Sequence, residues 1–272
     1  MYIYGRNVLL TGGSSGIGLA TAKLLAKNGY IVYAASRNPH ADTPNFPNGG
    51  AIHHIELNLC DNTSIAAIYE QLKPVGIGII IHCAGMGIAS PAEYYDSGSV
   101  NNLFTTNFFG ILQLNSLFLQ DMRKYRKGLC ITVGSVGGVF AIPFQAHYSA
   151  SKAALDAYTM ALRMELAKYN VQVCLVMPGD TNTGFTAARK YVIEKSSPYY
   201  NDCLKSVEKM ERDEVSGKAP ETCANVILKI CKSKKPPARK TVGLDYKILI
   251  LLKRLLPYCV IESALRKTYI KK

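Results

Sequence analysis

A glycine-rich turn near the N-terminus restricts most strongly how this chain can fold. Residues 7–10 form a short apolar run that predicts a buried strand, and Gly12, Gly16 and Gly18 follow it directly. Apolar residues at helical spacing then predict a helix that ends near Lys27, and residues 31–35 predict a second strand. A strand, a tight turn, a helix and a parallel strand make a βαβ unit. We therefore expect an α/β fold.

The chemistry of this turn suits a phosphate group. The first N–H groups of a helix have no partner within the helix, and the helix dipole adds positive potential there. A pyrophosphate can approach only where no side chain blocks it, which explains small residues at 12, 16 and 18. The spacing is GxxxGxG rather than GxGxxG. Glycine clusters alone are common, but one placed between the first strand and the first helix predicts a dinucleotide site.

The end of the second predicted strand indicates which dinucleotide is preferred. An acidic residue here would bind the adenosine ribose and repel a 2′-phosphate. The sequence instead reads Ser36-Arg37, and a guanidinium favours a phosphate through charge-assisted hydrogen bonds. We therefore expect NADP(H) to be preferred, with NAD(H) possible. The alternative is an arginine that is simply solvated at the start of a loop.

Strands and helices continue to alternate along the chain. Further strands are predicted at 51–57, 78–81, 129–133 and 171–176, with a possible seventh at 239–242. Helices are predicted at 63–72, 100–125, from the loop after 145 to 169, and at 220–232. This alternation predicts one doubly wound, Rossmann-type parallel sheet of about seven strands with helices on both faces, spanning residues 1–243.

Four polar residues are candidates for catalysis. Tyr148 and Lys152 are four residues apart on a predicted helix, so they share a face. An ammonium favours the phenolate, so Lys152 is expected to lower the pKa of Tyr148. Ser135 follows a central strand at the edge where α/β sheets bind ligands, and Asn107 interrupts an apolar helical stripe. Ordinary alternatives are a surface pair, a cap serine and a satisfied core amide.

The C-terminal third is less regular. Residues 180–218 are too long for a plain connector and are expected to cap a substrate, with Phe185 among its aromatic residues. Residues 244–272 are expected to form a basic amphipathic helical tail, whose element runs from 244 to 269. Its charged residues exclude a membrane-spanning helix. It could lie on an anionic bilayer, or pack on the domain or on a partner subunit.

Composition narrows the classes of function. The formal net charge is +13, and ten of these charges fall in the last 41 residues, where twelve basic residues face two acidic ones. The charge belongs to the tail, so we expect no nucleic-acid-binding role. The eight cysteines form no CxxC pair and no metal-type spacing, and no signal peptide is recognisable. We expect a reducing, cytoplasmic setting and no metal.

Taken together, these motifs resemble the short-chain dehydrogenase/reductase family. Thr11-Gly12-x-x-x-Gly16-x-Gly18 looks like its cofactor turn, and His82-Cys83-Ala84-Gly85 stands where Asn-Asn-Ala-Gly is usual. Ser135 and Tyr148-x-x-x-Lys152 look like its active site, with Asn107 as the helix asparagine. Within the family the chain looks most like the 17β-hydroxysteroid and retinol dehydrogenases. His82 and Cys83 depart from the usual asparagines, and Asn58 replaces an aspartate.

The resemblance implies residue roles. Tyr148 would exchange the proton, Ser135 would bind the carbonyl oxygen, Lys152 would also hold the nicotinamide ribose, and Asn107 would anchor a relay water. Ser135, Tyr148 and Phe185 would contact the substrate. The expected cofactor-binding residues are Gly12, Ser14, Ser15, Gly16, Ile17, Gly18, Arg37, Asn58, Leu59, Cys83, Ala84, Gly85, Tyr148, Lys152, Pro178, Gly179, Thr181 and Thr183.

The resemblance also implies reversible hydride transfer between a nicotinamide and a secondary alcohol or ketone, in a homodimer or homotetramer. The apolar residues after position 180 favour a hydroxysteroid. Other candidates are a lipid ketone, such as an acyl-dihydroxyacetone phosphate or 3-ketosphinganine, and a retinol. A hypothesis of another class is a non-catalytic NADP-binding sensor.

Overall fold

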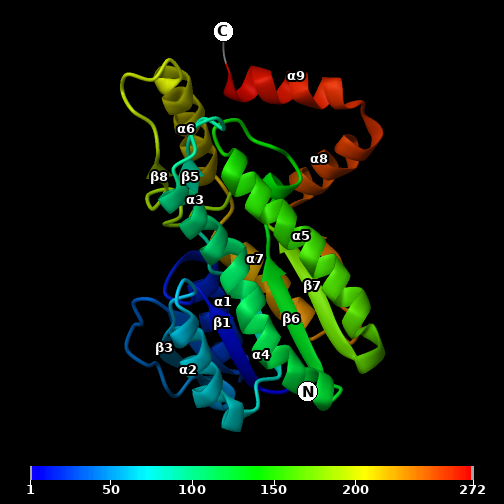
Figure 1. The fold of residues 1–272 in the computed structure, drawn as a ribbon. Helices are drawn as coiled ribbons and strands as arrows, with labels where there is room; N and C mark the ends of the chain where they lie inside the picture. Colours follow the sequence, from blue (N-terminus) through cyan, green and yellow to red (C-terminus); the bar gives the residue numbers. More distant parts are fainter. Residues whose placement is uncertain (1, 271–272) are drawn as a thin grey trace.

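The computed structural model describes residues 2–270 and contains one seven-stranded sheet with helices on both faces (Figure 1). Every neighbouring pair of strands is parallel, in the order β3-β2-β1-β4-β6-β7-β9. The strands are β1 Asn7–Thr11, β2 Ile31–Ser36, β3 Ala51–Glu56, β4 Ile79–His82, β6 Gly128–Val133, β7 Val171–Met177 and β9 Arg239–Thr241. This confirms the predicted doubly wound fold, including its seventh strand.

The longer helices follow the strands in alternation. They are α1 Gly16–Lys27, α2 Asn62–Leu72, α3 Ser97–Phe104, α4 Gly110–Lys124, α5 Ala146–Leu166, α6 Tyr200–Val215, α7 Pro220–Cys231, α8 Leu244–Leu255 and α9 Tyr258–Tyr269. Short 3-10 turns lie at Pro47–Gly49, Lys73–Val75, Val136–Gly138 and Ala167–Tyr169. A π-helical turn, Thr105–Phe109, joins α3 to α4, so the helix predicted over 100–125 contains a widened turn.

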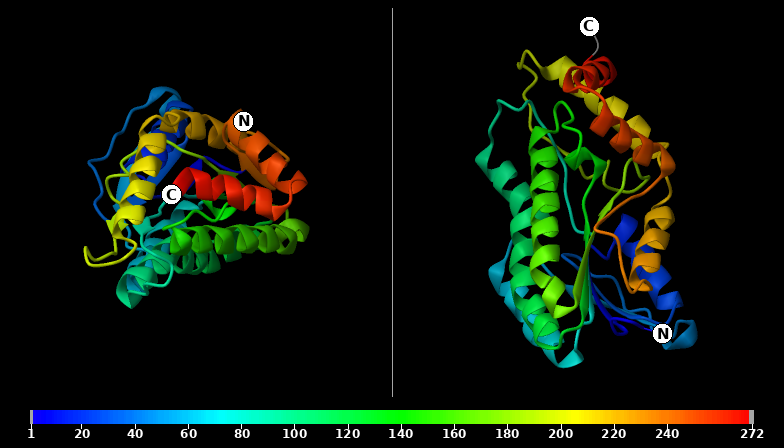
Figure 2. Two further views of the ribbon diagram at one scale, coloured as in Figure 1. Left: turned by 90° about the horizontal axis from the view of Figure 1, so that it is seen from above. Right: turned by 90° about the vertical axis from the view of Figure 1, so that its right-hand side faces the viewer.

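Side chains alternate across the sheet and build two cores. On β1, Val8 and Leu10 pack toward α1 and α7, whereas Leu9 packs toward α2 and α4. Figure 2 shows α4 and α5 on one face of the sheet and α1 and α7 on the other. Because the strands are buried on both faces, their sequences are continuous apolar runs.

Two short features escaped the sequence analysis. Ile88–Ala89 (β5) and Lys190–Tyr191 (β8) form a small parallel sheet that ties residues 180–193 to the segment after β4. In addition, the tail expected as one helix over 244–269 is two helices, with a break before Pro257. A proline inside a helix removes a backbone donor and clashes with the preceding turn, so α8 ends there and α9 begins after it.

The helices α6, α8 and α9 lie beyond the carboxyl edge of the sheet (Figure 1). This is the edge at which open α/β sheets bind ligands. Among the described residues, no helix is both long and apolar enough to cross a membrane.

Candidate functional site

The glycine turn is packed too closely to admit side chains. Gly12 and Gly16 have φ values of +72° and +50°, which glycine adopts without strain. A Cβ on Gly12 would lie 2.7 Å from the Ala84 backbone nitrogen, and one on Gly18 would lie 2.0 Å from the Gly12 carbonyl oxygen. The turn therefore seats against the segment after β4, and its glycines fit the close approach of a dinucleotide.

The start of α1 is open to a ligand. Ser15 is the N-cap, but its side chain makes no capping hydrogen bond. The first N–H groups of the helix are therefore free to donate to a ligand. Ser14 is half-buried and Ile17 contacts the core. Thr183 belongs to the segment after β7, and a Cβ on Gly16 would lie 3.2 Å from the Thr183 Cβ. Two predicted cofactor segments thus meet at this turn.

The other predicted cofactor residues also line the carboxyl edge. Arg37 is exposed one residue past β2, and it forms no ion pair within the described part of the chain. Asn58 is half-buried, and its side-chain oxygen accepts from the Cys60 N–H at 3.0 Å, so this amide is partly committed to its own loop. Leu59 is buried against Gly110. Arg37 therefore remains the more accessible of these polar groups.

His82 replaces a usual asparagine but still braces the sheet. It is fully buried, and its Nε2 lies 2.9 Å from the Asn115 side-chain oxygen. The Asn115 amide in turn donates to the Tyr158 hydroxyl at 3.4 Å, which links β4 to α4 and α5. Burial lowers the pKa of His82 to about 4, so the imidazole is neutral. Burial raises the pKa of the neighbouring Cys83 thiol.

Asn107 and Lys152 converge on Gly85. A Cβ on Gly85 would lie 3.4 Å from both the Asn107 side-chain oxygen and the Lys152 ammonium. Asn107 is fully buried in the π-helical turn, where its oxygen accepts from the Met86 N–H at 2.8 Å. Its amide donates to the Met86 carbonyl at 3.0 Å and to the Ser151 hydroxyl at 3.1 Å. The buried amide is thus satisfied, and it fixes the chain beside the lysine.

Tyr148 and Lys152 share one face of α5. The Lys152 ammonium lies 5.8 Å from the centre of the Tyr148 ring and donates to the Val133 carbonyl at 3.2 Å. Burial lowers the pKa of Lys152 to about 8. Burial also raises the pKa of Tyr148, and the Ser135 hydroxyl acts in the opposite direction. Desolvation of the phenol outweighs the contributions that lower its pKa, and a lowering by Lys152 stays a prediction.

Ser135 is held at the end of β6. Its hydroxyl oxygen accepts from the Gly137 N–H at 2.9 Å, and the next residue, Val136, donates its N–H to the Pro178 carbonyl at 2.9 Å. The serine loop and the segment after β7 are thereby joined. A hydroxyl and a phenol at one edge of the sheet can bind a carbonyl oxygen together.

The segment after β7 is covered by a residue that sequence reasoning missed. A Cβ on Gly179 would lie 2.1 Å from the Tyr246 ring of α8, and the Tyr246 hydroxyl donates to the Asp180 carboxylate. Burial raises the pKa of Asp180. Thr181 turns its hydroxyl back to the Gly179 carbonyl at 3.0 Å. No local pattern links residues 179 and 246.

Phe185 is placed beside Tyr148, with ring centres 5.7 Å apart. Behind it lies Arg189, which is buried and paired with Glu214 of α6. The Arg189 guanidinium carbon lies 6.0 Å from the centre of the Phe185 ring. The sequence analysis did not single out Arg189 or Glu214, because both lie among other charged residues in a stretch without a clear pattern.

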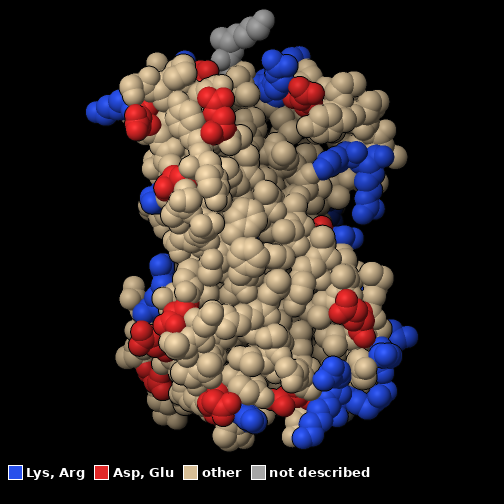
Figure 3. Space-filling model, viewed as in Figure 1, with Lys and Arg blue, Asp and Glu red and all other residues tan. Residues whose placement is uncertain are grey.

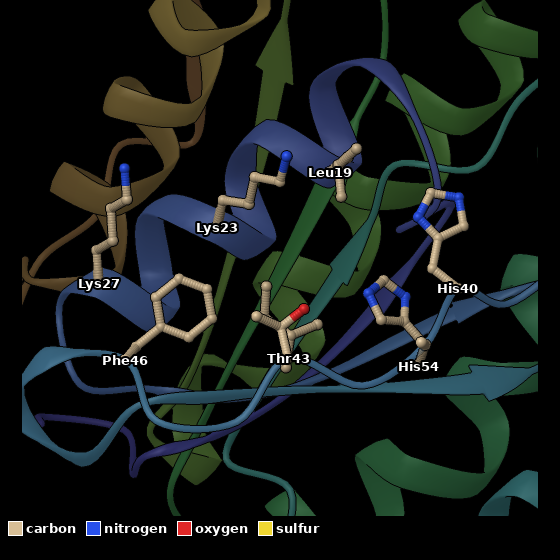
Figure 4. A pocket seen from close by; sticks show the side chains of 9 residues that line it. Leu19, Lys23, Lys27, His40, Thr43, Phe46 and His54 are labelled. Carbon is tan, nitrogen blue, oxygen red and sulfur yellow. The ribbon is translucent and has the colours of Figure 1, made fainter.

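Two cavities lie outside the cluster around Tyr148. One, of about 380 Å³, lies between α1 and the loop before β3, and its lining includes Lys23, His40, Phe46 and His54 (Figure 4). The other, of about 540 Å³, is lined by residues 94–96 and by six residues between 192 and 198. Across residues 2–270, no cluster of three or more metal-ligating side chains is found.

Comparison with known sequences finds relatives that are named as dehydrogenases or reductases. A family model described as short chain dehydrogenase matches residues 6–191. A 3-ketodihydrosphingosine reductase of Bacteroides thetaiotaomicron is 36% identical over 96% of this chain and 97% of its own length. Retinol dehydrogenase 8 of Bos taurus is 30% identical over 93% and 86%. The 17-beta-hydroxysteroid dehydrogenase type 1 of Mus musculus is 31% identical over 65% and 55%.

Solved structures share the fold. A short chain dehydrogenase from Burkholderia cenocepacia in complex with NADP has a TM-score of 0.73 and 22% identity, with full coverage of both chains. A short chain dehydrogenase/reductase from Burkholderia phymatum in complex with NAD has a TM-score of 0.79 and 17% identity, covering 94% of this chain and 95% of that one. The chain belongs to the short-chain dehydrogenase/reductase family and is an oxidoreductase that acts on CH–OH groups.

Proposed function

We propose that this enzyme reduces a long-chain lipid ketone of the 3-ketodihydrosphingosine type with NADPH. The supporting observation is the 36% identity to a 3-ketodihydrosphingosine reductase over 96% of the chain. That span takes in much of the region after β7, which lies over the candidate active site. The sequence motifs alone favoured a hydroxysteroid, with this ketone as one alternative, and the relative changes that preference.

Proton transfer is assigned to Tyr148. Because burial raises its pKa, the phenol is held protonated at neutral pH, which suits an acid that protonates a developing alkoxide. Ser135 donates its hydroxyl to the same oxygen and stabilises the negative charge there. Bound NADPH supplies the hydride. Tyr148 and Ser135 thus share the oxygen of the reacting carbonyl.

Lys152 and Asn107 support that acid. The Lys152 ammonium, with a pKa of about 8, is buried beside Gly85, where it can hold the ribose hydroxyls of the nicotinamide half. Asn107 keeps the Met86 backbone in place and, we propose, orders a water between the lysine and solvent. All four groups come from elements fixed by the sheet, so the acid is positioned before substrate binds.

NADP(H) is the proposed cofactor, with NAD(H) as a weaker alternative. Arg37 lies at the end of β2, where a 2′-phosphate would be placed, and the adjacent strand residue is Ser36 rather than an acid. One solved structure of this fold is in complex with NADP and another with NAD. Replacement of the arginine, Arg37→Gln, is expected to raise KM for NADPH and to leave KM for NADH nearly unchanged.

A panel of ketones tests the proposed substrate. Purified enzyme is assayed with NADPH and with NADH against 3-ketodihydrosphingosine, acyl-dihydroxyacetone phosphate, ketosteroids and all-trans-retinal. We expect the sphingoid ketone to have the highest kcat/KM. Tyr148→Phe should still bind NADPH but should lose on the order of 10²-fold or more in turnover. Turnover of only a steroid or retinal would reject the lipid-ketone assignment, and near-normal turnover by Tyr148→Phe would reject the proposed acid.

The second candidate is a steroid or retinoid dehydrogenase. It is favoured by the relatives named retinol dehydrogenase 8 and 17-beta-hydroxysteroid dehydrogenase type 1. The same panel separates it from the first. A purely cofactor-binding sensor is disfavoured, because Ser135, Tyr148, Lys152 and Asn107 are all present at the carboxyl edge.

We also propose that α8 and α9 lie on an anionic bilayer, in an otherwise cytoplasmic enzyme. No residue of α8 is buried, and Leu244, Leu251 and Leu255 expose 71%, 54% and 71% of their surface. Basic side chains lie beside this helix (Figure 3). An exposed apolar face with neighbouring cations suits the boundary between acyl chains and anionic head groups. The opposite side of α8 covers the candidate active site through Tyr246 and Ile250, so a lipid could enter directly from the membrane.

Vesicle sedimentation tests this contact. Binding should be stronger to phosphatidylcholine vesicles that contain phosphatidylglycerol than to phosphatidylcholine alone, and should weaken with salt. The double variant Leu251→Gln and Leu255→Gln should detach. Tyr125→Gln, which replaces another exposed apolar residue at the end of α4, is the matched control. Equal binding of both variants would contradict the proposal.

The enzyme is further proposed to form a homodimer or homotetramer through the helices that carry Asn107 and Tyr148. Figure 3 shows a broad uncharged area over α4 and α5. Phe109, directly before α4, and Met164 of α5 expose 54% and 74% of their surface. Light scattering of the purified enzyme, compared with the double variant Phe109→Ser and Met164→Ser, tests this arrangement.

A further inference from the structure

A buried guanidinium lies behind the substrate side of Tyr148. Arg189 is only 5% exposed, although it belongs to an irregular segment. Its Nη2 donates to Glu214, and its Nη1 lies 3.9 Å from a Glu211 carboxylate oxygen. The Phe185 ring lies near both the guanidinium, at 6.0 Å from its carbon, and the Tyr148 ring, with ring centres 5.7 Å apart. Burying a charged guanidinium costs desolvation free energy, which opposite charges and hydrogen bonds must offset.

One donor nitrogen of this guanidinium makes no hydrogen bond within residues 2–270, although the Glu211 carboxylate lies within ion-pair distance. That atom is Arg189 Nη1, which is buried. The Gln145 amide turns its oxygen toward Arg189, where it accepts from Nε and Nη2 at 3.2 Å each and does not reach Nη1. Gln145 begins the turn of α5 that carries Tyr148. A buried donor without an acceptor is unfavourable, so an oxygen of a bound molecule would satisfy it.

The charges around this donor are unbalanced toward the negative. Glu214 is committed to Arg189 and to the Thr186 hydroxyl. Glu211 accepts from the Tyr191 hydroxyl at 2.8 Å, and its side chain is 34% exposed. Two carboxylates thus face one guanidinium. A phosphate here would add to the negative charge in a partly buried place, whereas an ammonium would reduce it.

This local balance differs from that of the whole chain. The chain has a formal net charge of +13, but residues 180–218 carry seven acidic and seven basic residues. The excess positive charge therefore lies outside the segment that faces Tyr148. The tail can therefore attract anions, whereas the segment nearest Tyr148 carries no excess positive charge to do so.

We propose that Arg189, Glu211 and Glu214 form a subsite for the polar end of an amino-alcohol ketone. A hydroxyl oxygen of the substrate accepts from Arg189 Nη1, and the adjacent ammonium lies beside Glu211. The subsite admits cationic substrates and disfavours phosphate esters. This inference rests on the proposed reduction of a lipid ketone and specifies which lipid ketone fits.

Matched substrates test the subsite on the unmodified enzyme. In NADPH assays in detergent, 3-ketodihydrosphingosine is compared with its N-acetyl derivative, which lacks the positive charge, and with an acyl-dihydroxyacetone phosphate. We expect kcat/KM for the amine to exceed that for the N-acetyl compound at least roughly fivefold, mainly through KM, because partly exposed ion pairs contribute about 1 kcal/mol. The phosphate ester should be the poorest substrate.

Variants assign the effect to these residues. Glu211→Gln should raise KM for the amine about fivefold and change KM for the N-acetyl compound less than about twofold. Glu208→Gln is the control, since Glu208 lies on the same helix, with 62% of its side chain exposed, and its carboxylate is 4.0 Å from Arg212. Arg189→Lys, which loses the planar fork, should lower kcat/KM for both ketones, because both keep the hydroxyl.

The outcomes separate the two proposals. Reduction of both sphingoid ketones with equal kcat/KM, or a preference for the phosphate ester, overturns the subsite and leaves lipid-ketone reduction standing. Equal losses for both ketones in Glu211→Gln show a purely structural role and also overturn it. Failure to reduce any lipid ketone, with turnover of a steroid or retinal, rejects the proposed function and the subsite with it. If Glu211→Gln does not fold, the selectivity of the unmodified enzyme still decides.

Discussion

Replacement of Asn107 by alanine should destabilise the protein well beyond the loss of an ordinary surface residue. The side chain is fully buried, and it satisfies both backbone groups of Met86 as well as the Ser151 hydroxyl. Ser151 keeps its own bond to the Tyr148 carbonyl at 2.8 Å, so the variant leaves two backbone groups unsatisfied. A buried group without a partner costs about 1–3 kcal/mol, and because Met86 is half-buried we take the lower end for each group, which gives about 2–3 kcal/mol for Asn107→Ala.

Thermal unfolding measures this cost. For a protein of this size about 1 kcal/mol shifts Tm by roughly 2–4 °C, so the expected decrease is on the order of 10 °C. Asn101→Ala is the matched control, because Asn101 lies on the adjoining helix and is exposed. That control should change stability by less than about 0.5 kcal/mol.

A second variant separates the two halves of the amide. Asn107→Asp keeps an acceptor for the Met86 N–H but cannot donate to the Met86 carbonyl while ionised. It should therefore also be destabilised at pH 7, and acidification that protonates the carboxyl should restore part of the loss. If Asn107→Ala unfolded within about 2 °C of Asn101→Ala, the bonds to Met86 would not stabilise this turn, and the reasoning would be refuted.

Three further changes test the site and its surroundings. Lys152→Met should abolish activity yet raise stability at pH 7 by about 1–3 kcal/mol, because burial lowers the pKa of this lysine from 10.5 to about 8. The lysine's penalty is complete below about pH 8 and is relieved as the pH rises toward 10.5, so urea unfolding at pH 7 and 10 should show the advantage shrinking. His82→Asn should flatten the loss of stability in acid: with its pKa lowered from 6.5 to about 4, the folded protein holds this histidine neutral, and stability falls as the pH drops from 6.5 toward 4. Urea unfolding at pH 7.5 and 5 measures the difference, and equal slopes for both proteins would contradict the assignment. Gly18→Ala should weaken NADPH binding at least roughly tenfold, since its Cβ would lie 2.0 Å from a backbone oxygen, whereas Gly184→Ala, with nothing within 4 Å, should change it little in the same fluorescence titration.

The fold was predictable because its signals are local. Apolar runs mark each central strand, glycines mark the first turn, and Pro220 marks the start of α7. These features act over a few residues and need no knowledge of the distant chain. The same holds for Tyr148 and Lys152, whose spacing on one helix already places them on one face.

The features that escaped prediction depend on distant partners or on very short elements. β5 and β8 have two residues each, too few for alternation to appear. The Arg189–Glu214 pair joins positions 25 residues apart, and either residue alone reads as a solvated charge. The break before Pro257 was visible as a proline, but the leucine stripe on both sides suggested one continuous helix.

The sheet with α5 and the segments that cover its carboxyl edge should tolerate substitutions differently. The proposed proton-handling groups are held by backbone and buried polar contacts of the sheet and of α5, such as Asn107 to Met86. The covering segments are held by the short β5–β8 pairing and, among themselves, by side-chain contacts such as Lys218 to Asp245 at 2.8 Å and Tyr246 to Asp180. We therefore expect a substitution in the cover to alter what is bound without moving the proposed acid, Tyr148, and to change KM more than kcat. The relatives of this chain carry names as different as 3-ketodihydrosphingosine reductase, retinol dehydrogenase 8 and 17-beta-hydroxysteroid dehydrogenase type 1, as expected where one fold serves several substrates through its less constrained covering contacts.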